Sequence, residues 1–188
     1  MKKILLSLLI LNSISCFSQE NFTKIEFDNA THYGEKWNTD IKLFLYGNYT
    51  QENYETVVST VKEFNSLMES IKITIVDDID KSNSVIYFTS DDEFIKLFDW
   101  SSKDVKNSTG ITYIYHAGKK IVKCRTHIDI IECGKHKCTP ITIRHEMFHI
   151  LGFCHQENEK NTILKSKSVD MTERDKEMIS LLYKSITF

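Results

Sequence analysis

The chain has 188 residues, with 24 Lys and Arg against 26 Asp and Glu and a formal net charge of −2. Its lysines are scattered among acidic residues without a basic stripe, which argues against nucleic acid as a partner. The length suits one domain with a hydrophobic core, and with one proline and six glycines no stretch has the composition of a linker.

The amino terminus has the form of an export signal. Lys2 and Lys3 precede an apolar run over residues 4–11, and small and polar residues follow through Gln19. The run is too short for a permanent membrane helix, so we expect no transmembrane anchor after its removal. We therefore predict a signal peptide over residues 1–19 and one secreted or periplasmic domain over 20–188, with lipid attachment at Cys16 as the alternative to simple cleavage.

Strands and helices are then expected in alternation. Residues 41–46 are rich in strand formers and stop at Gly47, and residues 51–70 carry apolar side chains at helical spacing. Further elements are predicted as strands over 71–76 and 85–88, a short helix over 91–98, and strands over 110–116 and 121–131 that form a hairpin or lie as neighbours around Gly118.

Two capped helices complete the chain. Thr139 can cap and Pro140 can open a helix over residues 141–151, since proline is tolerated at a first helical position. Residues 171–175 resemble a second capped start, in which Asp175 favours the helix terminus. The apolar residues that follow indicate a terminal helix, which we expect to pack beneath the functional site.

The first of these helices carries the pattern H-E-x-x-H-x-x-G-x-x-H from His145 to His155. His145 and His149 are four residues apart and point the same way on a helix, so both can reach one tetrahedral ion. Gly152 can adopt the left-handed backbone that ends a helix and returns His155 to the same ion. This five-residue pattern is far more specific than H-E-x-x-H alone.

These residue types predict zinc-assisted hydrolysis. Three neutral imidazoles leave the fourth position of Zn²⁺ for a water molecule, and Glu146, about 100° around the helix from His145, can accept its proton. The alternative is a capped amphipathic helix with solvated or core histidines, which three histidines at this spacing disfavour. For the remaining histidines we keep that structural interpretation: His32, His116, His127 and His136.

Four cysteines follow the signal segment. In an exported chain they predict up to two disulfides, and the short spacing of Cys133 and Cys138 makes that pair sterically easy, which leaves Cys124 for Cys154. A metal site formed by Cys133, His136, Cys138 and Cys124 is the weaker alternative. Cys154 adjoins His155, where we expect a disulfide or a buried thiol rather than a zinc ligand.

The motif resembles that of the metzincin zinc metallopeptidases, the zincin group that includes matrixins and astacins, and also short bacterial metzincin-type domains. The resemblance is specific over residues 139–188 and architectural before them. It implies an α+β fold with a twisted five-stranded mixed sheet, a backing helix, an active-site helix and a C-terminal helix. It also implies that an edge strand, here residues 110–116, binds extended substrate.

The sequence departs from that family at one point. Metzincins place a methionine in a tight turn under the zinc, and a matrixin-like spacing puts Ile163 or Leu164 there. Leu164 could fill this hydrophobic floor, because the methionine is not a ligand. Met171 would suit a longer spacing, but we favour it as the apolar residue before the terminal helix.

The resulting hypothesis is a secreted, monomeric zinc metalloendopeptidase that cleaves peptide or protein substrates, with Glu146 as general base. A catalytically weak or inactive zinc-binding or adhesive surface domain is the alternative. Arg144 could steer a substrate carboxylate, although we favour a solvating role on the helix surface.

Overall fold

The computed structural model describes residues 30–31, 34–106, 108–130, 139–155, 162–164 and 170–184. The predicted signal segment, Cys16, His32, Cys133, His136 and Cys138 lie outside the described residues. Among the helices of the described ranges, none is both long and apolar enough to cross a membrane.

The centre of the fold is a mixed sheet in which β5 is the antiparallel edge strand. Parallel pairs join β2 to β3, β2 to β4, β4 to β6 and the short β1 to β6, whereas β5 pairs antiparallel with β6. The strands are β1 (Lys36–Trp37), β2 (Ile41–Gly47), β3 (Ile73–Ile75), β4 (Ser84–Thr89), β5 (Gly110–Ala117) and β6 (Lys120–Asp129). The five longer strands confirm the predicted mixed sheet, and the two-residue β1 was not predicted.

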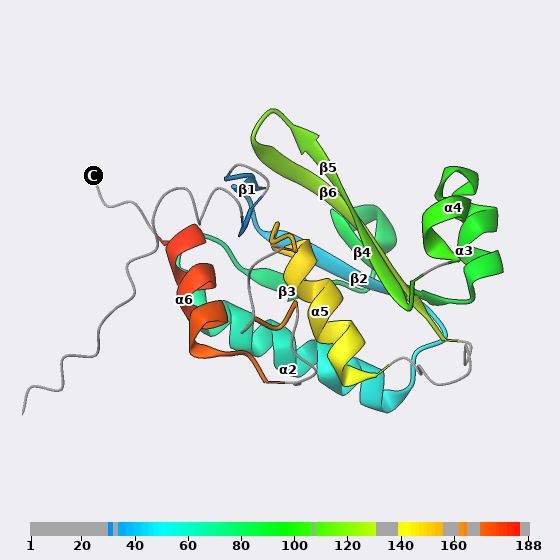
Figure 1. Cartoon of the computed structure of the whole chain (residues 1–188), viewed down its shortest axis with the longest axis horizontal. Coiled ribbons are helices and arrows are strands. Elements are labelled where there is room, and N and C mark those ends of the chain that lie inside the picture. The colour runs from blue at the N-terminus through cyan, green and yellow to red at the C-terminus, as the bar shows by residue number, and fades with distance from the viewer. Residues whose placement is uncertain are drawn as a thin grey trace, which may run out of the picture.

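The helices cover the two faces of this sheet. They are α2 (Gln51–Leu67), α3 (Asp91–Leu97), α4 (Ser102–Val105), α5 (Pro140–Ile150) and α6 (Glu173–Leu182), with 3₁₀ turns at Ile79–Lys81 and Asp99–Ser101. In Figure 1, α5 lies between the backing helix α2 and the β5–β6 hairpin, and α6 packs against α2. Helices α3 and α4 lie apart from these three helices. The helix order agrees with the α+β fold expected from the sequence, with a backing helix, a helix after the sheet and a C-terminal helix.

Two hydrophobic cores explain this layering. The larger core lies between the sheet and helices α2, α5 and α6, and it includes Trp37, Phe64 and Phe148, each fully buried. The smaller one packs α3 and α4 against the other face through Phe94 and Val105. Because both faces are covered, all six residues of β4 are buried, which accounts for the continuous apolar run in its sequence.

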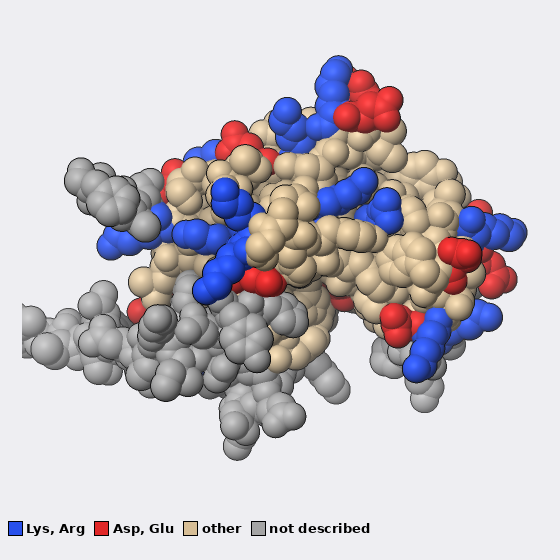
Figure 2. All heavy atoms as spheres, turned by 90° about the horizontal axis from the view of Figure 1, so that it is seen from above, with Lys and Arg blue, Asp and Glu red and all other residues tan. Residues whose placement is uncertain are grey.

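The surface carries charges of both signs. On the face shown in Figure 2, Lys and Arg are interspersed with Asp and Glu, with uncharged surface between them. The described residues of this face therefore have the mixed charge distribution that the composition indicated.

Candidate metal centre

Local signals at its two ends form helix α5, which carries His145, Glu146 and His149. The Thr139 side chain accepts a hydrogen bond from the Thr142 amide at 3.2 Å, and Pro140 occupies the first turn, as the sequence predicts. At the other end Gly152 has φ +99°, and a Cβ there would lie 2.8 Å from Ile121 Cδ1. Glycine is thus required both by the left-handed backbone and by close packing, and the chain turns back after it.

This turn brings the three predicted histidines together. The Nε2 atoms of His145 and His149 are 3.2 Å apart, and those of His145 and His155 are 3.3 Å apart. All three side chains offer ligand atoms within 4.8 Å of one another. Zinc–nitrogen bonds of about 2.0–2.1 Å at tetrahedral angles place nitrogens about 3.3 Å apart, so this donor set fits a tetrahedral zinc ion.

Backbone carbonyls orient two of these rings. The Nδ1 atom of His149 lies 2.7 Å from the Phe153 carbonyl oxygen, which selects the tautomer that donates from Nδ1 and leaves the Nε2 lone pair available. His145 makes a backbone hydrogen bond to Ile163. Burial and the neighbouring His155 lower the pKa of His145 to about 4, so its ring is neutral at physiological pH, as metal binding requires.

Glu146 points from α5 toward the edge strand. Its side chain is 4% exposed, and burial raises its pKa from the ordinary 4.5 to about 7. Thr112 on β5 opposes this shift by donating a hydrogen bond to Glu146 Oε2 at 2.8 Å. A carboxyl group that titrates near neutral pH can both accept and return a proton.

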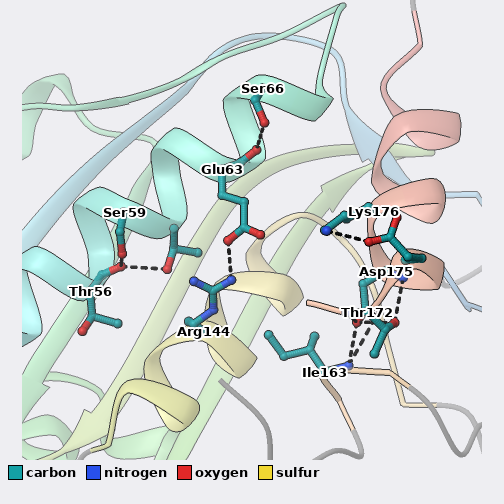
Figure 3. A network of polar contacts seen from close by, with 11 residues as sticks. Thr56, Ser59, Glu63, Ser66, Arg144, Ile163, Thr172, Asp175 and Lys176 are labelled. Atoms are coloured by element: carbon teal, nitrogen blue, oxygen red, sulfur yellow. Dashed lines mark hydrogen bonds and ion pairs between the residues drawn. The ribbon is translucent and has the colours of Figure 1, made fainter. Parts of the chain in front are cut away.

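The turn at residues 162–164 is held by α6 (Figure 3). Its Ile163 backbone forms a hydrogen bond with His145. The Ile163 amide donates to both carboxylate oxygens of Asp175, at 3.2 and 3.1 Å, and Asp175 also accepts from the Thr172 amide and hydroxyl at 2.8 Å. Burial raises the pKa of Asp175, while these hydrogen bonds oppose the shift. Asp175 therefore caps α6, as predicted, and also fixes the turn beside His145.

The turn at residues 162–164 occupies the place where metzincins have a methionine under the zinc. Ile163 is fully buried and Leu164 is 6% exposed in the main core, while the Ile163 backbone reaches His145. Met171 is buried directly before α6, where the sequence placed it. The turn at residues 162–164 thus lies at the matrixin-like spacing and carries aliphatic side chains.

The structure corrects the interpretation of Arg144. Its side chain is buried instead of solvated, and its guanidinium forms an ion pair with Glu63 on α2 (Figure 3). This contact joins α5 to the backing helix α2. The separation of 81 residues between the partners explains why local sequence patterns did not reveal it.

An open pocket of about 480 Å³ connects these groups. It is bounded by α5, by residues 153–155 after this helix and by β5. On its opposite side, β5 pairs with β6. Its lining consists of Ser108, Gly110, Ile111, Thr112, Ile114, His145, Glu146, His149, Phe153, Cys154 and His155. The sequence did not single out Thr112, although strand alternation places it on the same face as Gly110 and Ile114.

The expected disulfide between Cys124 and Cys154 is not formed. Cys124 is fully buried and its Sγ lies 3.8 Å from the Ile150 carbonyl oxygen, an environment that raises the thiol pKa. Cys124 thus belongs to the core beneath α5, and the strand pairing of β6 sets its position. The other expected bridge, between Cys133 and Cys138, lies outside the described residues and stays a prediction.

Structural comparison defines the class of this fold. No protein-family model matches the chain, and no curated protein sequence matches it. The solved structures do provide matches, and the chain has a metzincin-like fold.

Two of the similar structures are of myroilysin, a metallopeptidase. One has a TM-score of 0.53 and 11% sequence identity over 84% of this chain and 100% of the other. The second has a TM-score of 0.48 and 12% identity over 85% of this chain and 93% of the other. At these identities the likeness concerns the fold, and the chemistry must be argued from the site itself.

Proposed function

We propose that this chain is a secreted zinc-dependent metalloendopeptidase. The observation that carries the proposal is the convergence of three histidine nitrogens, at 3.2 and 3.3 Å separations, in a pocket that also contains the buried carboxylate of Glu146. The myroilysin-like fold supports the assignment at the level of a metallopeptidase fold. A domain that only binds zinc does not need a carboxyl group with a pKa of about 7 in the same pocket.

The residues of this chain divide the reaction between them. His145, His149 and His155 would hold the metal through neutral Nε2 atoms. Zinc at this place would polarise a peptide carbonyl and acidify water. Glu146 accepts a proton from the attacking water as its oxygen bonds to the carbonyl carbon. It then donates that proton to the amine nitrogen as the carbon–nitrogen bond breaks.

The edge strand suits an extended peptide substrate. β5 is hydrogen-bonded to β6 along one side, and the pocket lies beside residues 110–114 of β5. A peptide that added to this edge would use the backbone hydrogen-bonding groups of the strand. Its scissile bond would then lie over Glu146 and the three histidines, which supports an endopeptidase.

The test compares metal content and cleavage in matched variants. Protein expressed from the full coding sequence should contain about one zinc per chain and cleave casein or a quenched peptide library, with activity lost in a chelator and restored by zinc. Glu146→Gln should retain the zinc and lose cleavage. Glu55→Gln, at an exposed position of α2, serves as the control and should cleave normally.

Two outcomes would contradict the proposal. Cleavage that persists in Glu146→Gln would remove the general-base role from Glu146. Stoichiometric zinc without cleavage in the unaltered protein would instead favour the zinc-binding surface domain.

Secretion is part of the same proposal and has its own test. Cell fractionation should find a processed chain outside the cytoplasm. Replacement of Cys16 by serine should leave its distribution unchanged if residues 1–19 are simply cleaved, whereas release from a membrane fraction would indicate lipid attachment.

A further inference from the structure

Two threonine hydroxyls form a chain that ends on Glu146. Thr126 of β6 and Thr112 of β5 are direct partners in the antiparallel ladder, and their Oγ1 atoms are 3.0 Å apart. Thr112 Oγ1 is also 2.8 Å from Glu146 Oε2 and 3.3 Å from the Glu146 carbonyl oxygen. Thr126 is fully buried, so bulk water does not compete for its hydroxyl, while Thr112 is half-buried at the edge of the pocket.

The direction of the chain follows from what each group can donate. An ionised carboxylate only accepts hydrogen bonds, and each threonine hydroxyl has one proton. When Thr112 donates to Glu146 Oε2, its oxygen is left as the acceptor for the Thr126 hydroxyl. The two hydroxyls are thereby ordered toward Glu146, and Oε2 is occupied by this bond.

Gly110 of β5 leaves the space that the Glu146 side chain occupies. A Cβ at position 110 would lie 2.8 Å from Glu146 Cγ, closer than real Cβ atoms approach other atoms, and 3.0 Å from Oε1, tighter than most real contacts. The absence of a side chain at Gly110 therefore gives the carboxylate its place against β5. Oε1 has no hydrogen-bond partner among the described residues, and Glu146 lines the open pocket.

We infer that Thr112, Thr126 and Gly110 are positioning residues that hold the Glu146 carboxylate in one orientation, with Oε2 tied to β5 and Oε1 directed to the attacking water. This inference rests on the proposed hydrolytic function. Proton transfer requires the base within hydrogen-bonding distance of its proton, so a carboxylate that rotates or withdraws loses activity without losing substrate or metal.

Steady-state kinetics of zinc-loaded variants test this role. Thr112→Val removes the hydroxyl at nearly constant volume and should lower kcat about 10- to 100-fold, the loss expected for one hydrogen bond to a charged group, with KM nearly unchanged. Thr112→Ser keeps the hydroxyl and should restore kcat. Thr126→Val should cause a smaller loss in the same direction, and Gly110→Ala should lower kcat by displacing the carboxylate.

Two further measurements separate positioning from general damage. Zinc affinity, measured by competition with a chromophoric chelator, should be the same in Thr112→Val and in the unaltered protein. Thr74→Val is the matched control, because Thr74 is an exposed threonine on β3, away from the pocket. Its kcat, KM and zinc affinity should all stay at the unaltered values.

A binding measurement tests the inference without requiring cleavage. Acetohydroxamic acid chelates zinc and carries an acidic proton that a correctly placed Glu146 can accept. Its affinity for the zinc-loaded protein should fall about 10-fold in Thr112→Val, recover in Thr112→Ser and stay constant in Thr74→Val.

Equal hydroxamate affinity in all four proteins, or equal impairment of the valine and serine variants, would overturn the positioning role. Loss of zinc affinity in Thr112→Val would also overturn it, because the residue would then act on the metal centre. Unaltered protein that binds zinc and hydroxamate but cleaves no peptide would refute the proposed function, while the hydroxamate series would still decide the positioning role.

Discussion

Replacing Glu146 by glutamine should stabilise the metal-free protein at alkaline pH while removing its proposed activity. Glu146 is buried, and burial raises its pKa from 4.5 to about 7 in the folded protein. Between these values the folded state retains a proton that the unfolded state has lost. The stability contributed by that proton is complete below pH 4.5 and is lost as the pH rises through 7.

The size of this effect follows from the two pKa values. A difference of about 2.5 pH units at about 1.36 kcal/mol each corresponds to roughly 3 kcal/mol of lost stability at pH 8. Glutamine keeps the shape and can still accept the Thr112 hydrogen bond, but it does not ionise. The stability difference between Glu146→Gln and the unaltered protein should therefore increase by about 3 kcal/mol from pH 4 to pH 8.

Urea unfolding in the presence of a chelator measures this difference at several pH values. Titration of His145 occurs in both proteins and so largely cancels. Glu55→Gln, at an exposed position of α2, is the control for removing a carboxylate that is not buried. A stability difference for Glu146→Gln that is the same at pH 4 and pH 8 would refute the reasoning, since it would mean that burial does not disfavour the carboxylate.

Three further predictions concern a metal ligand, the turn beside His145 and a buried histidine that packs against Phe94 on the other face of the sheet. His149→Ala should lose zinc and the stabilisation that zinc provides, about 2.7 kcal/mol at 100 times the dissociation constant, and a zinc-dependent melting temperature in this variant would contradict the ligand assignment. Asp175→Ala leaves the buried Ile163 amide without its acceptor, so urea unfolding should show a loss of about 2 kcal/mol and chelator competition a roughly 10-fold weaker zinc affinity. His127 is buried and its pKa is lowered by desolvation, so stability should fall as the pH drops below 6.5, and His127→Gln should show a smaller fall. If stability falls equally below pH 6.5 in His127→Gln and in the unaltered protein, His127 does not cause the fall.

Local patterns in the chain predicted the helices and strands that have enough residues for periodicity to be visible. Thr139 and Pro140 marked the start of α5 at the observed residue, and the apolar stripe of α2 marked its course to within three residues of its end. The two-residue β1 and the four-residue α4 were not predicted, because elements so short have no periodicity to detect.

The metal-binding triad was predictable for a similar reason. His145 and His149 lie one helical turn apart, and the positive φ of Gly152 is a local property of glycine, so three ligands within eleven residues converge by local geometry. The interpretation of Arg144 and the bridge between Cys124 and Cys154 were wrong because the surroundings of both residues come from distant segments: Glu63 for Arg144, and the β6–α5 packing for Cys124.

The amino-acid sequence by itself determined the order of elements, the capped helix α5 and the spacing of its histidines, because these depend on contacts between residues a few positions apart. The tertiary structure decided what surrounds Glu146 and His145. Thr112 and Thr126 meet through the register of two strands, and Asp175 reaches Ile163 through the docking of α6. Such pairings depend on burial and strand register across the whole domain, which no short stretch of sequence encodes.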